Sequence, residues 1–264
     1  MRKSSSALLI SAVSCMFLGQ HVRAGIISPN TVVAGKTQSE WSAAWWRWAL
    51  SYPASTNPLF DSTGAFAYLG NQGTVFFLAG TATGSPATRQ ATVGSGQYLF
   101  FPLLNTVTTA DFSAYGGGED NLKRDAAETL GIDPSGNAPN TTLFAELNGV
   151  NMPLPPPAAT LLAFRQISPP GTFDVVIPAD SPFGPPGVLP SKSDGWWLML
   201  SPLAEGKYTL RFGGATTGIG AYEGVPTTQD NTFTITVVPE PATVVLVAAA
   251  GILVLLRRAA CANT

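Results

Sequence analysis

Cysteine and histidine are almost absent from this chain of 264 residues, which contains two cysteines and one histidine. Cys15 and His21 lie near the N-terminus and Cys261 lies near the C-terminus, so residues 25–237 contain neither type. This part of the chain therefore cannot form a Ser-His-Asp triad, a cysteine nucleophile, a disulfide or the usual zinc, copper, haem and iron–sulfur ligand sets. We expect no cofactor and no metal site, and stability that comes from apolar burial.

Charge is also scarce, because only 11% of the residues are charged and the formal net charge is −2. Residues 25–237 contain nine basic and fifteen acidic residues. Without a basic excess the chain cannot neutralise many phosphates, so nucleic acid is not an expected partner. Hydrophobic residues make up 45% of the chain, which is enough to build a core.

Helix-breaking residues are abundant instead, with 27 glycines and 22 prolines. This content argues against a helical bundle or a coiled coil. Residues 207–212 and 232–237 alternate strictly between apolar and polar types, which predicts two strands with one buried face each. The residues expected to point inward are Tyr208, Leu210, Phe212, Phe233, Ile235 and Val237.

Apolar runs of strand length occur at residues 74–79, 97–104, 173–177 and 196–200. Dipeptides that favour turns separate them, among them Asn148-Gly149 and Asp194-Gly195. Many short strands with such turns predict a mainly β fold, a β-sandwich of the Ig-like or jelly-roll kind. We favour one domain over residues 25–237, although the prolines at 153 and 155–157 could also form a linker between two domains.

Two segments are predicted to be helices. Residues 37–51 begin with a capping box formed by Thr37 and Glu40. Trp41, Trp45 and Trp48 follow at helical spacing and define a Trp-rich helix. Residues 119–130 begin with acidic residues, which favour a helix N-terminus, and end before a glycine.

The tryptophans are the first candidates for ligand contact. The stripe of Trp41, Trp45 and Trp48 is interpreted as packing the helix onto the sheets, with a platform for sugars or a membrane surface as the alternative. Trp196 and Trp197 are neighbours in a predicted strand, so their side chains point to opposite faces. We expect one of these two rings in the core, and the other is a candidate for exposure, with stacking on a ligand as the alternative to a packing role.

Paired carboxylates are the remaining catalytic option, since glycosidases use two acids that face one cleft. None of the candidates lies in a recognisable motif, and the chain is not expected to be an enzyme. Glu119 and Asp120 are more simply explained as helix-start acids, and Asp194 as a turn residue before Gly195. Residues 133–137 are interpreted as a plain turn rather than a calcium loop. The acids considered are Glu119, Asp120, Asp61, Glu146, Asp174 and Asp194.

Residues 1–24 have the features of a secretory signal peptide. Arg2 and Lys3 precede an apolar stretch at residues 7–18, and small residues precede Gly25. Signal peptidase is therefore expected to cleave between Ala24 and Gly25. The alternative, an N-terminal membrane anchor, is disfavoured because the apolar stretch is too short to span a bilayer comfortably.

A second apolar segment, residues 243–256, contains no charge and is followed by Arg257 and Arg258. As a helix it is roughly 21 Å long at about 1.5 Å per residue, against about 30 Å for the hydrocarbon core. The segment is apolar on every side, which fits a single transmembrane helix better than a buried helix of the body. The arginine pair predicts a cytoplasmic C-terminus and a body on the other side of the membrane.

Val238, Pro239, Glu240 and Pro241 stand immediately before that segment. The order of Pro-Glu-Pro, apolar helix, arginine pair and chain end resembles the PEP-CTERM sorting tail of Gram-negative bacteria, here residues 238–264. The resemblance implies recognition of the Pro-Glu-Pro by exosortase, a membrane-embedded cysteine transpeptidase. It also implies cleavage near this motif and transfer to the cell surface or an exopolysaccharide matrix. A proline-initiated helix start is the alternative explanation.

The body also resembles a family of exported bacterial proteins of unknown function, through its Trp-rich helix and residues 97–105 and 193–212. Three functions remain open: a structural or adhesive surface protein, a carbohydrate-binding module of the matrix, and a polysaccharide-active enzyme. An exposed aromatic row would favour the second function, and a cleft with two carboxylates would favour the third. A plain closed surface would leave the first, which we take as the leading expectation.

Overall fold

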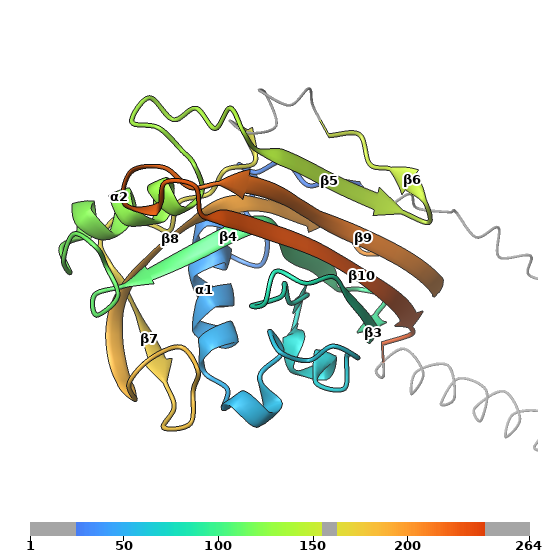
Figure 1. Cartoon of the computed structure of the whole chain (residues 1–264). Coiled ribbons are helices and arrows are strands. Elements are labelled where there is room, and N and C mark those ends of the chain that lie inside the picture. Colours follow the sequence, from blue (N-terminus) through green and yellow to red (C-terminus); the bar gives the residue numbers. More distant parts are fainter. Residues whose placement is uncertain (1–24, 155–162, 241–264) are drawn as a thin grey trace, which may run out of the picture.

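The computed structural model describes residues 25–154 and 163–240, which form two five-stranded sheets and two α-helices (Figure 1). The first sheet has the strand order β1-β2-β4-β8-β7. The bounds of its strands are β1 (Asn71–Gln72), β2 (Val75–Phe77), β4 (Tyr98–Thr109), β8 (Gly187–Leu200) and β7 (Phe173–Ile177).

The second sheet has the strand order β3-β10-β9-β5-β6. Neighbouring strands are antiparallel in both sheets, except that β2 runs parallel to β4 and β3 runs parallel to β10. The bounds of its strands are β3 (Ala87–Gly94), β10 (Pro226–Val238), β9 (Gly206–Thr217), β5 (Thr142–Leu147) and β6 (Val150–Asn151).

The sheets pack face to face over a shared apolar core. Phe101 of β4 contacts Phe212 of β9 with ring centroids 4.4 Å apart, and Phe212 stacks on Phe233 of β10. The residues of this core alternate along β4, β8, β9 and β10. Burial of large aromatic side chains between the sheets supplies the main driving force for this packing.

Helix α1 (Gln38–Leu50) covers the opposite face of the first sheet and forms a second core with it. Trp45 meets Trp197 of β8 at 5.4 Å between ring centroids. Thr37 and Glu40 form the capping box expected from the sequence. The remaining helical elements are α2 (Glu119–Thr129) and the short 3₁₀ turns η1 (Ala54–Thr56), η2 (Ala67–Gly70) and η3 (Gly220–Tyr222).

The prediction of a mainly β fold with a Trp-rich helix and one further helix is confirmed. The inward-facing residues of β9 and β10 are buried as the alternation predicted, except that Tyr208 is only half-buried. Asn148 and Gly149 both have positive φ and join β5 to β6 in a tight turn, as expected for this dipeptide. Four strands, β1, β3, β5 and β6, were not predicted from the sequence.

Two predictions on β8 are wrong. Asp194-Gly195 is not a turn, because β8 continues through it from Gly187 to Leu200. Trp196 and Trp197 point to opposite faces, yet their exposed fractions are 1% and 0%. Neither ring is available to stack on a ligand, because the second sheet covers one face of the first sheet and α1 covers the other.

Several predicted segments lie outside the described residues, namely the signal peptide 1–24, the prolines 155–157, Pro241, the segment 243–256 and the pair Arg257 and Arg258. None of the helices in the described residues has the length and apolar character needed to cross a membrane. The described chain begins at Gly25, which donates its backbone N–H to the Ser201 hydroxyl at 2.9 Å. It leaves the second sheet at Val238, the last residue of β10.

Candidate ligand-binding cavity

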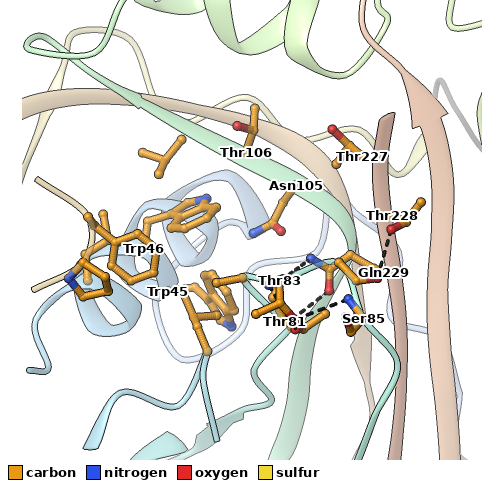
Figure 2. A pocket seen from close by; sticks show the side chains of 18 of the residues that line it. Trp45, Trp46, Thr81, Thr83, Ser85, Asn105, Thr106, Thr227, Thr228 and Gln229 are labelled. Carbon is orange, nitrogen blue, oxygen red and sulfur yellow. Dashed lines mark hydrogen bonds between the residues drawn. The ribbon is translucent and has the colours of Figure 1, made fainter. Parts of the chain in front are cut away.

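A cavity of about 730 Å³ opens between α1, the loop of residues 80–85, and the edges of β4 and β10 (Figure 2). Its size falls within the range of roughly 300–1,000 Å³ that small-molecule sites occupy. Two other cavities in the described part of the chain are smaller, at about 10 and 400 Å³.

The cavity exists because the outer strands of both sheets are short. β2 pairs with β4 only as far as Phe100, and β3 pairs with β10 only from Asn231 onward. Beyond these points, the edges of β4 and β10 have no strand neighbour on that side among the described residues. Consecutive residues of each free edge, 105–107 on β4 and 226–229 on β10, therefore line the cavity.

One wall of the cavity is aromatic and apolar. Trp45 and Trp46 come from α1, and their rings pack edge to face with centroids 5.0 Å apart. The Trp45 indole N–H donates to the Leu78 carbonyl at 3.1 Å, which fixes this ring. Leu50 and Val107 continue the wall. Figure 2 shows the two indoles together on one side of the cavity.

The other wall consists of hydroxyls and amides. Gln229 ties the loop to β10, because its Oε1 accepts from the Thr81 backbone N–H at 2.8 Å and its Nε2 donates to the Thr81 carbonyl at 2.7 Å. The hydroxyls of Thr81 and Thr83 lie 3.0 Å apart. The hydroxyl and amide side chains of the lining are Thr81, Thr83, Ser85, Asn105, Thr106, Thr109, Thr227, Thr228 and Gln229.

Three buried polar atoms on lining residues lack a hydrogen-bond partner within the described residues: Trp46 Nε1, Asn105 Nδ2 and Thr109 Oγ1. All three residues are at least nine-tenths buried, and Asn105 stands between the two walls (Figure 2). A buried polar group without a partner costs about 1–3 kcal/mol.

No residue that lines the cavity carries an ionisable side chain. A charged ligand would therefore lose its hydration without gaining an ion pair, which is costly in a partly enclosed site. The lining combines flat aromatic surface with neutral hydrogen-bonding groups. It is suited to an uncharged ligand that is apolar on one side and rich in hydroxyls on the other.

The carboxylates considered from the sequence lie outside this lining, and most of them have structural partners. Asp194 forms an ion pair with Arg165, with Nη2 and Oδ2 2.6 Å apart. Glu119 accepts from the buried Lys192 ammonium at 2.8 Å, and this interaction lowers the pKa of Glu119. Glu119 and Asp120 are in the first turn of α2, as expected.

Asp61 and Asp133 also serve local structure, and Glu146 forms an ion pair with Arg211, with Oε1 and Nη1 3.6 Å apart. Burial raises the pKa of Asp61, but hydrogen bonds from the backbone N–H groups of Phe66, Thr63 and Gly64 outweigh this effect and lower it overall. The Asp133 carboxylate accepts from the backbone of its own turn. Among the described residues there is no cluster of three or more His, Cys, Asp or Glu side chains that could hold a metal.

The interpretation of the tryptophan stripe as a packing surface is confirmed, because Trp41, Trp45 and Trp48 are all buried. Sequence reasoning missed the role of Trp46 and of Asn105. The strand predicted at 97–104 stops just before Asn105, whereas β4 continues to Thr109. The β-branched residues 106–109 were a signal for this extension.

In comparisons with known proteins, no family model, no curated protein and no solved structure matches this chain.

Proposed function

We propose that this protein is an exported surface or matrix protein whose folded body binds a neutral carbohydrate in the cavity. The observation that carries this proposal is the composition of the lining: apolar side chains that include Val107, Phe112 and Phe183, together with seven hydroxyl side chains and two amides, without an ionisable group. The Trp45 and Trp46 indoles lie behind this surface, because their exposed fractions are only 0% and 8%. A sugar ring has apolar C–H faces that pack against aromatic rings, and a rim of hydroxyls that both donate and accept hydrogen bonds. The two walls of the cavity match these two surfaces.

Binding without hydrolysis is the proposed role. Glycosidases need a carboxylic acid on each side of the scissile bond, and the lining contains no carboxylate. The protein would then be adhesive, with the body attached to polysaccharide of the matrix. A polysaccharide-active enzyme finds no support in this cavity.

Export and sorting are part of the same proposal and rest on the ends of the sequence. Signal peptidase would release Gly25, and an exosortase would act near Pro239, Glu240 and Pro241 after a transmembrane helix at 243–256 has held the precursor in the inner membrane. The position of β10 supports this order of events, because the strand ends at Val238 and the Pro-Glu-Pro motif follows it directly in the chain. The two packed sheets are compatible with the predicted β-sandwich, and the Ig-like or jelly-roll class stays a prediction.

The test is a binding panel with the purified full-length protein. The probes are cello-, laminari-, manno- and galacto-oligosaccharides, together with an acidic polysaccharide such as alginate. Calorimetry at low and high salt should detect a neutral oligosaccharide whose affinity does not depend on salt, because no ionic contact contributes. Val107→Phe, which adds a ring inside the cavity, should abolish binding.

Val176→Phe is the matched control, because Val176 is an exposed valine of β7 outside the cavity. It should bind like the wild type, and both variants should keep the wild-type circular dichroism spectrum. The proposal is overturned if none of the neutral oligosaccharides binds, if only alginate binds and salt abolishes its binding, or if Val107→Phe binds as tightly as the control.

A further inference from the structure

Three phenylalanines surround the mouth of the cavity, and each comes from a different loop. Phe60 lies between η1 and η2, Phe112 between β4 and α2, and Phe183 between β7 and β8. Phe60 and Phe112 are 41% and 57% exposed, whereas Phe183 is half-buried. The exposed rings of Phe60 and Phe112 leave apolar surface in contact with water, which is unfavourable unless a ligand covers it.

The three rings are linked through residues 183 and 184, and we call them together the aromatic rim. The rings of Phe60 and Phe183 lie 5.4 Å apart at an interplanar angle of 33°. Phe112 lies over Gly184, where a Cβ atom would come within 2.5 Å of the Phe112 ring. Gly184 has a φ of +127°, a conformation that favours glycine. Phe112 and Phe183 also line the cavity, so the aromatic rim is continuous with the cavity lining.

The charge around the rim limits what can bind there. The loops 110–118 and 178–186 and residues 51–66 contain no lysine or arginine. Asp111 and Asp180 are exposed beside Phe112 and Phe183 in the chain. Acidic groups at this place disfavour an anionic membrane surface and an acidic polysaccharide, because like charges repel. The surface suits an uncharged ligand with flat apolar faces.

We propose that the aromatic rim is an extension of the carbohydrate site, on which further sugar units of the same chain stack outside the cavity. This inference rests on the proposed function. Phenylalanine has no hydrogen-bonding group, so the rim would hold these units by ring-to-face contact, and the hydroxyls and amides of the cavity would select the inner unit. The protein would therefore recognise an oligosaccharide or a polysaccharide end rather than a single sugar.

Chain-length dependence tests the inference. A disaccharide and a hexasaccharide of each neutral series are titrated into the full-length wild type, Phe60→Ala and Phe112→Ala. We expect the hexasaccharide to bind the wild type more tightly than the disaccharide. Each variant should weaken hexasaccharide binding roughly two- to tenfold, which corresponds to the loss of one aromatic contact. The disaccharide affinity of Phe60→Ala should stay unchanged, because Phe60 does not line the cavity.

Tyr68→Ala is the matched control, because Tyr68 is 66% exposed and does not line the cavity. This variant should keep both affinities. Thermal unfolding of each variant checks that the fold is intact, and vesicles of phosphatidylglycerol provide a test for the membrane alternative.

The outcomes separate this inference from the proposed function. If a disaccharide binds but the hexasaccharide gains nothing, the rim is overturned and the cavity site stands. If neither probe of any series binds, both fall. If Phe60→Ala weakens both probes equally, the ring supports the shape of the cavity and the rim is overturned. Vesicle binding that Phe112→Ala abolishes, with both sugar affinities unchanged, would assign the rim to a membrane instead.

Discussion

Replacement of Asn105 by leucine should make the protein more stable and less able to bind. Asn105 is 8% exposed, and its Nδ2 has no hydrogen-bond partner in the described part of the chain. Leucine has nearly the same shape and removes a buried polar group that costs about 1–3 kcal/mol. A gain of about 1 kcal/mol would raise the melting temperature by about 2–4 °C for a body of this size. Affinity for a neutral oligosaccharide should fall about tenfold, because leucine removes one amide group from the hydrogen-bonding wall of the cavity.

Asn231→Leu is the control, because Asn231 is a buried asparagine with its hydrogen bonds made. Its Oδ1 accepts from Arg89 Nη1 at 3.0 Å, and its Nδ2 donates to Gln229 Oε1 at 3.0 Å. Leucine at this position would leave a buried guanidinium short of an acceptor and should destabilise the protein by about 1.5–3 kcal/mol.

The assay combines thermal or urea unfolding of the full-length protein with calorimetric titration of the oligosaccharides. The expected pattern is a rise in stability for Asn105→Leu, a fall for Asn231→Leu and weakened binding for Asn105→Leu. The reasoning is refuted if Asn105→Leu loses as much stability as Asn231→Leu, because Asn105 would then be a satisfied structural residue. It is equally refuted if Asn105→Leu becomes more stable and binds as well as the wild type.

Three further predictions concern the rest of the molecule. Arg165→Met should lower the free energy of unfolding in urea by about 3–5 kcal/mol, because it leaves the buried Asp194 carboxylate unpaired. A second change of Asp194 to leucine should restore much of this loss, and no recovery would contradict the ion-pair argument. Burial raises the pKa of Tyr222 from 10 to about 12, so the protonated phenol stabilises the fold below pH 10 and this contribution is lost as the pH rises through about 12. In Tyr222→Phe the unfolding free energy should therefore fall less steeply between pH 10 and pH 12. An unchanged slope would argue against a raised pKa of Tyr222. Pro239→Ala combined with Pro241→Ala should leave the precursor at near full length in the inner membrane, as shown by fractionation and mass spectrometry of the C-terminus, whereas unchanged processing would favour a permanent anchor.

The sequence determined the features that depend on near neighbours. Strict alternation placed Phe233, Ile235 and Val237 on one face of a strand, because side chains of a strand alternate whatever it packs against. The capping box of Thr37 and Glu40 set the start of α1 in the same way, since its hydrogen bonds span only one turn. The absence of histidine and cysteine from residues 25–237 excluded whole classes of chemistry before any fold was known.

Only the tertiary structure decided the environment of each face and the place of the site. Trp197 is buried because α1, which ends well over a hundred residues earlier in the chain, covers the outer face of its sheet. Asp194 is a strand residue rather than a turn residue because β8 pairs with β4 through this position, and Arg165 supplies its counter-charge inside the protein. The cavity depends on where β2 and β3 stop pairing, which leaves the edges of β4 and β10 open toward each other. Strand length at a sheet edge is set by long-range hydrogen bonding and packing, and local sequence pattern carries little information about either.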